Sequence, residues 1–327
     1  MSDEIQRHDL GELGPELGRG GQAVVYAVPE LQLPDTTGPL VYKEYKKDQV
    51  SPNGLRAIVA VRSRLIPRRR DQLDTVAAWP ARVVRDGTRM CGVVLPLIPD
   101  SFFQERVLPS GKPSRDPREI QNLFIDPSRA VQLGMPLMSL ADRFAVCRDL
   151  AFALALLHDH DVVFGDVNAK NVLFRKYPDP AVMLVDCDAV RIRGSAPVVR
   201  QLSAPDWDPP EGHVLTQATD MYKFGLVVLR VLIPGGQAST ARDPDRLAGP
   251  LLDAEGRQLL RAALSPDPRA RPHASTWRRY FALRVGRREV GPAVSTDAAE
   301  PQTTDPPPRP TAGWRRDPHT GTWVPAT

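Results

Sequence analysis

The chain has 327 residues, a formal net charge of +4 at pH 7 and 42% hydrophobic residues. This length and composition allow one large domain or two lobes with a substantial core. The three cysteines are scattered without CxxC spacing, which argues against a disulfide framework or a zinc site and indicates a reducing compartment. The acidic, polar N-terminus does not have the pattern of a signal peptide, and no apolar run has the length of a membrane span. We therefore expect a cytoplasmic protein.

The first hundred residues predict short strands and two helices. ELGRGGQAVVYAV predicts a turn followed by a strand, GPLVYKEY a second strand, and ARVV with MCGVVLPLI a hairpin. SPNGLRAIVAVRSRLI predicts a helix with Ser51 as N-cap and Pro52 at its first position, and RRRDQLDTVAA predicts a second short helix. The basic run RSRLIPRRR is interpreted as a solvated helix face, with binding to an anionic partner as the alternative. No aromatic residues interleave with it, which argues against stacking on single-stranded nucleic acid.

The rest of the chain predicts mostly helices. Residues 101–137 are polar and rich in proline, which predicts an irregular insertion. From Ser139 onward, apolar residues recur at steps of three and four, which is typical of an amphipathic helix. Three further helices are predicted over TQATDMYKFGLVVLRVLI, LLDAEGRQLLRAAL and HASTWRRYFALRV. Residues 286–312 predict a disordered, proline-rich linker, and the Trp-containing tail 313–327 is either disordered or a short docking segment for a protein partner.

A partial glycine-loop pattern precedes a lysine within a strand. Gly18 and Gly20 take the first two glycine places of G-x-G-x-x-G-x-V, Ala23 takes the third, and Val25 takes the valine place. Small residues in such a loop let backbone N–H groups approach phosphate oxygens. Lys43 follows in an apolar strand, at a spacing that suits a lysine that pairs with phosphates.

Two polar segments between apolar runs carry the expected catalytic chemistry. In FGDVNAKN, Asp166 precedes Asn171 by the spacing of D-x-x-x-x-N, with Lys170 between them. A carboxylate at this place accepts a hydroxyl proton, the Asn oxygen binds Mg²⁺, and the lysine offsets phosphoryl charge. In MLVDCDAV, Asp186 ends an apolar strand and is expected to bind the same metal. Asp188 is left open between a second metal ligand and a structural hydrogen-bonding residue.

In this order, the four segments resemble the signature motifs of a protein kinase. Over residues 8–285 the chain is similar to bacterial serine/threonine protein kinases, in particular to a divergent, actinobacterial-like group with G-D-x-N-x-x-N and D-x-D motifs. DWDPPEG resembles the A-P-E element with Glu211 as its acid, and LSPDPRARP resembles the late D-P-x-x-R-P element with Arg271. The resemblance implies a buried Glu211–Arg271 pair and an Asp220 that holds the catalytic-loop backbone.

The resemblance implies an α+β, bilobal protein kinase-like fold, with a small β-rich N-lobe over 8–98, a larger helical C-lobe over 99–285 and a disordered C-terminal tail. It implies ATP and Mg²⁺ as cofactors and transfer of the γ-phosphoryl group to Ser/Thr hydroxyls of a protein substrate, without a specific nucleic-acid partner. A segment between the lobes would receive adenine through backbone groups of Leu95 and Leu97. The implied site residues are catalytic Asp166 and Lys170, metal ligands Asn171 and Asp186, and nucleotide-binding Gly18, Gly20, Ala23, Val25, Lys43, Leu95 and Leu97.

The sequence lacks the helix acid that pairs with the phosphate-binding lysine in this family. Residues 51–68 contain no Asp or Glu, and Arg56, Arg62 and Arg64 stand in the region where the acid is expected. Three partners for the lysine stay open, namely Asp71, Asp74 and Glu44.

Two further positions depart from the usual motifs. Phe164 and Gly165 replace the His and Arg of H-R-D, and Cys187 replaces the Phe of D-F-G. A pseudokinase that serves as a nucleotide-binding scaffold is therefore the alternative to an active kinase. A small-molecule phosphotransferase is a third hypothesis, which the A-P-E-like element and its Arg271 partner disfavour.

Overall fold

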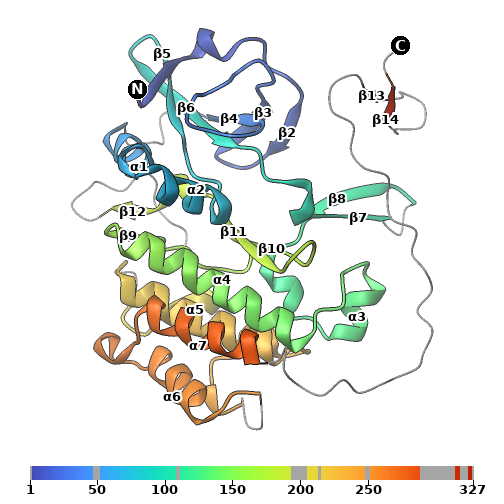
Figure 1. The fold of residues 1–327 in the computed structure, drawn as a ribbon, viewed down its shortest axis with the longest axis vertical. Coiled ribbons are helices and arrows are strands. Elements are labelled where there is room, and N and C mark those ends of the chain that lie inside the picture. Colours follow the sequence, from blue (N-terminus) through green and yellow to red (C-terminus); the bar gives the residue numbers. More distant parts are fainter. Residues whose placement is uncertain are drawn as a thin grey trace. The chain divides into compact units, whose positions relative to one another are not determined.

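The computed structural model describes residues 2–46, 52–107, 111–192, 205–212, 215–246, 251–287, 314–316 and 323–325. The chain divides into two compact units, residues 1–290 and 291–327. The first unit is mixed α+β, which is compatible with a bilobal kinase fold (Figure 1). The expected linker 286–312 lies almost entirely outside the described residues, as does the expected N-cap Ser51.

A six-stranded sheet forms the N-terminal part of the first unit (Figure 1). Its order is β1-β5-β6-β4-β3-β2, with β1 parallel to β5 and all other neighbours antiparallel. The predicted hairpin is confirmed as β5 and β6, and the predicted strands as β3 and β4. The strands are β1 (Glu4–Gln6), β2 (Glu16–Arg19), β3 (Ala23–Ala27), β4 (Leu40–Tyr45), β5 (Arg82–Asp86) and β6 (Arg89–Pro96).

The sheet register aligns the residues expected to bind nucleotide. Val25 of β3 is paired with Gly18 of β2 on one side and with Lys43 of β4 on the other. Because side chains alternate between the faces of a strand, Val25 and Lys43 share one face. On β4 this is also the face of Val41, which belongs to the largest core cluster, whereas Tyr42 packs in a separate cluster on the opposite face. Lys43 is thereby directed toward the body of the unit and away from the outer face.

Gly92 of β6 allows the two central strands to approach each other closely. A Cβ at this position would lie 2.3 Å from the backbone oxygen of Lys43 and 2.5 Å from the Tyr42 ring. The nearer contact is to backbone, which cannot move aside as a flexible side chain can.

We expect Gly92→Ala to destabilise the folded state by about 3 kcal/mol through overpacking of the sheet. Chemical denaturation of the variant beside Gly87→Ala, whose site is open in space but has a φ of +61°, separates crowding from backbone strain. Equal losses for the two variants would contradict the crowding argument.

Two helices follow β4, as predicted: α1 (Pro52–Arg64) and α2 (Pro67–Val76). The solvated-face interpretation of the basic run is wrong for Arg62, which is 1% exposed. Its guanidinium donates to Asp74 at 2.6 and 2.8 Å and to Asp35 at 2.9 Å, and Arg82 reaches Asp35 at 2.6 Å. Asp35 lies in the loop before β4, so the buried charges join that loop to both helices and to β5. The sequence pattern did not identify this network because Asp35 is remote from Arg62 along the chain.

Residues 101–137 are not irregular as expected. They contain an antiparallel hairpin of β7 (Phe103–Val107) and β8 (Pro113–Pro117), followed by α3 (Pro127–Gln132). The prolines of β8 lie at its two ends, where a missing N–H costs the ladder least. Asp126 caps α3 through its side chain. Local capping and cross-strand pairing thus build structure in a segment whose composition suggested none.

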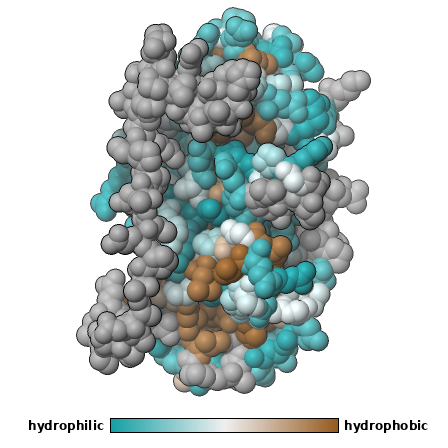
Figure 2. Space-filling view, turned by 90° about the vertical axis from the view of Figure 1, so that its right-hand side faces the viewer, coloured by the Kyte–Doolittle hydropathy of each residue, from teal (hydrophilic) through white to brown (hydrophobic). Residues whose placement is uncertain are grey.

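An apolar area lies in the central part of the lower half of the face that Figure 2 shows, on the side where Figure 1 places α3. Three large apolar side chains in and after α3 are exposed, namely those of Val131, Leu133 and Leu137.

Four helices form the C-terminal part of the first unit. α4 (Leu140–His158) begins at the predicted Ser139, whose side chain and that of Asp142 form a capping box. α4 is buried on most sides rather than amphipathic, because it lies between other helices and β11. The other predicted helices are confirmed as α5 (Gln217–Leu232), α6 (Ala254–Ala263) and α7 (Ala274–Arg287).

Short strands frame the polar segments singled out in the sequence. β10 (Val172–Arg175) pairs with β11 (Ala181–Leu184), and β9 (Val162–Val163) pairs with β12 (Arg191–Ile192). The segment FGDVNAKN therefore connects β9 to β10, and DCDA follows β11. None of the described helices has the length and apolar character needed to cross a membrane.

The second unit contains one described pair of strands. β13 (Trp314–Arg316) and β14 (Trp323–Pro325) pair antiparallel. The remaining residues of 313–327 lie outside the described ones.

Candidate active site

Asp166 is held in place by two amides of its own loop. Asn168 donates to one carboxylate oxygen at 2.8 Å and Asn171 to the other at 2.7 Å. The Asn168 amide is itself fixed, because its oxygen accepts from the backbone N–H groups of Lys170 at 2.8 Å and Asn171 at 3.0 Å. Asp166 is partly buried and Lys170 is exposed. The expected base and the expected metal ligand Asn171 are thus in direct contact, and Lys170 lies on the same turn.

The backbone before Asp166 is held by α5. Asp220 is fully buried and accepts the N–H groups of Phe164 at 2.8 Å and Gly165 at 2.7 Å. Lys223, one helical turn on, donates to the Gly165 oxygen at 2.7 Å. Gly165 has φ +75°, a conformation that favours glycine. The Asp220 role implied by the resemblance therefore has the expected geometry, and His158, 3.0 Å from Asp220, is a partner that the sequence did not indicate.

Asp186 lies beside this loop at the end of β11. The backbone N–H of Val185 donates to the backbone oxygen of Asn171 at 3.0 Å, which joins the two segments. Asp186 adopts φ +56° and its side chain is 59% exposed. Within the described part of the chain, no three His, Cys, Asp or Glu side chains cluster as a metal site. One amide oxygen and one exposed carboxylate nevertheless fit Mg²⁺, which keeps several water or phosphate ligands.

Lys43 reaches this edge from β4. Its amine lies 3.0 Å from an Asp186 oxygen and 2.8 Å from an Asp188 oxygen, and its side chain is 15% exposed. Burial would lower the pKa of Lys43, but the charges of Asp188 and Asp186 outweigh it and raise the pKa above its usual value. Lys43 is therefore a buried cation with two acidic partners.

Asp188 uses both carboxylate oxygens within the protein. One accepts from Lys43 and the other from the Tyr45 hydroxyl at 2.5 Å, and the side chain is 5% exposed. Burial, reinforced by the Asp188 charge, raises the pKa of Tyr45, so the hydroxyl stays protonated and donates. Of the two roles left open for Asp188, the structural hydrogen-bonding residue agrees with these contacts. The sequence gave no signal for Tyr45.

None of the three acids considered as partners of Lys43 pairs with it in the structure. Asp74 binds Arg62, and Glu44 points to the opposite face of β4, where Arg7 donates to it at 3.2 Å. The backbone oxygen of Asp71 accepts from the Thr75 hydroxyl within α2. The acids that face the Lys43 amine instead follow β11, far along the chain from β4.

The expected glycine loop is a tight turn between β2 and β3. Gly18 lies within β2, and the Gly20 N–H donates to the Ala23 backbone oxygen at 2.9 Å. Lys46, beyond β4, donates to the Gly20 oxygen at 2.6 Å. Small residues at this turn leave open space around Gly18, so the backbone stays accessible. Val25 follows in β3, opposite Lys43.

The two residues expected to receive adenine lie at the end of β6. Leu95 pairs with Val41 of β4 inside the sheet and is 8% exposed. The Leu97 N–H donates to the Pro39 oxygen at 2.9 Å. This amide is therefore engaged in extending the strand pairing, whereas the Leu97 side chain is exposed.

The implied Glu211–Arg271 pair is present. Arg271 donates to both Glu211 oxygens, each at 2.6 Å, and also to the Ala218 oxygen at 3.0 Å. Burial would raise the pKa of Glu211, but the Arg271 hydrogen bonds hold it below its usual value. The bidentate pair joins the segment before α5 to the one before α7.

Cys187, between the two acids, is fully buried. Burial raises the pKa of its thiol well above the usual value, and the neighbouring carboxylates act in the same direction. It is therefore an unreactive thiol that packs in the core.

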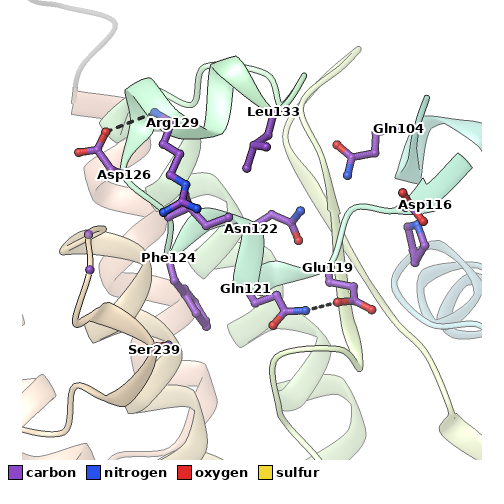
Figure 3. A pocket seen from close by; sticks show the side chains of 14 residues that line it. Gln104, Asp116, Glu119, Gln121, Asn122, Phe124, Asp126, Arg129, Leu133 and Ser239 are labelled. Atoms are coloured by element: carbon purple, nitrogen blue, oxygen red, sulfur yellow. Dashed lines mark hydrogen bonds between the residues drawn. The ribbon is translucent and has the colours of Figure 1, made fainter. Parts of the chain in front are cut away.

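A cavity of about 620 Å³ lies next to the segment FGDVNAKN (Figure 3). It is joined to that segment through the Gln121 N–H, which donates to the Ala169 oxygen at 3.4 Å. Carboxylates of Asp116, Glu119 and Asp126 and the guanidinium of Arg129 line it. Figure 3 also shows the Gln121 amide donating to Glu119.

Comparison with known proteins finds distant relatives. No protein-family model matches the chain. Two curated proteins, each named Protein kinase YegI, are 24% identical to it: one from Escherichia coli strain K12 over 286 residues, the other from Escherichia coli O157:H7 over 281 residues. The matches cover 81% and 79% of this chain but 39% and 38% of the relatives, so the chain spans about two fifths of their length. The chain is thus distantly similar to bacterial protein kinases over most of its length.

Proposed function

We propose that the chain is a protein kinase that transfers the γ-phosphoryl group of ATP to Ser or Thr hydroxyls of a protein substrate. The observation that carries the proposal is the contact network of the site, in which the Asn171 side-chain amide donates to Asp166 and the Asn171 backbone oxygen accepts from the residue before Asp186. Lys43 reaches the same acid from the sheet. These contacts support a site in which the expected base, metal ligands and phosphate-binding lysine act together.

In this proposal each residue has a distinct role. Asp166 accepts the proton of the attacking hydroxyl, and its two amide contacts keep a carboxylate oxygen aimed at the acceptor. Asn171 and Asp186 would hold Mg²⁺, which neutralises charge on the phosphate oxygens when bound. Lys43 and Lys170 offset the charge that develops on the transferred group.

Two features favour a protein substrate over a small molecule. The Glu211–Arg271 pair anchors the segment that precedes α5, as the resemblance implies for a protein-substrate platform. The cavity in Figure 3, whose lining residue Gln121 contacts Ala169, provides room for part of a polypeptide chain. The proposed choice of Ser and Thr over Tyr rests on the resemblance alone.

The proposal is tested by phosphate transfer from γ-labelled ATP to generic protein substrates, followed by phosphoamino-acid analysis. We expect transfer to Ser or Thr that requires Mg²⁺ or Mn²⁺. Asp186→Asn is expected to lower transfer at least about 100-fold, because the metal loses its only carboxylate ligand in this set. Asp179→Asn, an exposed acid in the turn between β10 and β11, is the matched control and keeps wild-type activity. No transfer by the wild type with either metal would overturn the proposal.

A nucleotide-binding scaffold is the second candidate, and one observation favours it. The Lys43 amine is occupied by Asp186 and Asp188, whereas no acid of α1 pairs with it. Thermal unfolding with and without Mg–ATP separates the two functions. Metal-dependent stabilisation without any phosphoryl transfer supports the scaffold, because binding to the folded state alone raises its stability.

A further inference from the structure

The site contains an acid that has no assigned role in phosphoryl transfer. Asp188 is almost fully buried, and each of its oxygens has a partner on β4: the Lys43 amine and the Tyr45 hydroxyl. Lys43 and Tyr45 are two positions apart on one strand, so they point to the same face and reach one carboxylate together. A buried carboxylate with both oxygens satisfied has a defined position.

The helix that would normally supply an acid to this lysine cannot do so here. Residues 51–68 contain no acid, and the buried cation of α1, Arg62, is committed to Asp35 and Asp74. The lysine must therefore obtain its fixed partner from another element.

The two acids in contact with Lys43 differ in their freedom to move. The Asp186 side chain is 59% exposed, whereas that of Asp188 is 5% exposed and bonded to Tyr45. An exposed carboxylate can turn from the lysine toward a metal ion without leaving a buried charge unpaired. If Asp188 turned away, its own charge and that of Lys43 would both be buried without a partner.

We propose that Asp188, held by Tyr45, is the positioning acid of Lys43 and replaces the missing helix acid; this inference rests on the proposed nucleotide-binding role of Lys43. Asp188 touches neither nucleotide nor metal. It fixes the lysine amine so that Asp186 is released for the metal while Lys43 stays in place for the phosphates. The lysine is thereby positioned by the segment after β11, independently of where α1 lies.

The test is a double-mutant cycle between Asp188 and Lys43, measured first on Mg–ATP binding by titration calorimetry and then on transfer. We expect Asp188→Asn to weaken Mg–ATP binding about tenfold and to lower kcat about 100-fold, because a misplaced reacting group costs about that factor. In a Lys43→Met background the same substitution is expected to change binding by less than about twofold, because its effect passes through the lysine. A merely structural role would give equal effects in both backgrounds and would overturn the inference.

Two further variants sharpen the cycle. Tyr45→Phe removes one hydrogen bond to Asp188 and is expected to weaken Mg–ATP binding about threefold, again only when Lys43 is present. If Asp188→Asn lowers the melting temperature too far for measurement, Tyr45→Phe replaces it in the cycle with Lys43→Met. Glu44→Gln is the matched control, because Glu44 lies between Lys43 and Tyr45 on β4 but faces the other side and binds Arg7. An effect of Glu44→Gln as large as that of Asp188→Asn would contradict the inference.

Failure of the proposed kinase function can be distinguished from failure of this inference. If the wild type binds Mg–ATP but transfers no phosphate, the kinase proposal fails, and the binding cycle still decides the role of Asp188. If transfer occurs but the cycle is additive, the kinase proposal stands and the positioning role is wrong.

Discussion

Replacing Asp166 by asparagine is expected to lower phosphoryl transfer about 10³-fold, while Mg–ATP binding changes by no more than about fivefold. A general base contributes roughly 10²–10⁴-fold to proton-transfer catalysis, and a carboxamide cannot accept the proton of the attacking hydroxyl. Asp166 contacts neither Lys43 nor Asp186 in the described hydrogen bonds, so these two side chains keep their positions, and only the metal ligand Asn171 loses a contact. The measurement is kcat for transfer beside the dissociation constant for Mg–ATP.

The two amides around Asp166 determine what the substitution does to the loop. Both Asn168 and Asn171 donate N–H groups to the carboxylate, one to each oxygen. In the variant the NH₂ group of the new carboxamide therefore faces one of these two donors. Asn168 cannot turn its amide over, because its oxygen accepts from two backbone N–H groups. Asn171 must therefore adjust, at a cost on the order of 1 kcal/mol for one lost hydrogen bond.

The control for this rearrangement is Asn168→Ala, which removes one amide contact but leaves the carboxylate. We expect a loss of activity on the order of tenfold for this variant, well below the loss for Asp166→Asn. Equal losses would mean that loop geometry, and not proton acceptance, explains the effect. A fully active Asp166→Asn protein would rule out Asp166 as the base.

The elements of the fold were predictable where local signals agreed with tertiary packing. Ser139 and Asp142 form the capping box at the start of α4, and the strand pattern of LVYKEY places Lys43 and Val41 on one face of β4. Capping and alternation are properties of a few neighbouring residues, which the sequence displays directly. The hairpin of β7 and β8 was missed because its proline-rich composition outweighed a pairing that only the folded chain shows.

The candidate site was predictable in its parts but not in its connections. The spacing of Asp166 and Asn171 and the position of Asp186 after a strand identified residues that the fold brings to one edge. The partner of Lys43 was not predictable, because it depends on how the segment after β11 meets β4. A search restricted to the helix after the lysine could not find Asp188, and nothing in the spacing singles out Tyr45.

The partners of Asp35 were also not predictable, because they are remote from it in the sequence. Substitution of Asp35 has the largest expected effect on stability. Its carboxylate lies among Arg62, Arg82 and Arg70, at 2.9, 2.6 and 3.8 Å. The side chains of Asp35 and Arg62 are 3% and 1% exposed. We expect Asp35→Asn to lower the free energy of unfolding by about 3–5 kcal/mol, because it leaves buried guanidinium groups without their shared counter-charge.

The matched control for Asp35 is Asp245→Asn, which breaks an Asp–Arg pair at the surface. Asp245 and its partner Arg261 are 64% and 59% exposed, so the loss is expected to be no more than about 0.5 kcal/mol. Both variants are measured by urea denaturation at pH 7 and low salt. If the two variants lost similar amounts of unfolding free energy, burial would not explain the stabilising effect of the Asp35 cluster.

The same carboxylate predicts how stability depends on pH. Burial would raise the pKa of Asp35, but the hydrogen bonds and charges of Arg82 and Arg62 outweigh it and hold the pKa below its usual value of about 3.9. A group whose pKa is lowered on folding stabilises the folded state fully above its unfolded pKa and loses that contribution as the pH falls through its folded pKa. Wild type should therefore lose stability relative to Asp35→Asn below about pH 4. Because protonation of Asp35 removes the same charge that the substitution removes, the two unfolding curves should converge in acid, and parallel curves from pH 7 to pH 3 would contradict the assignment.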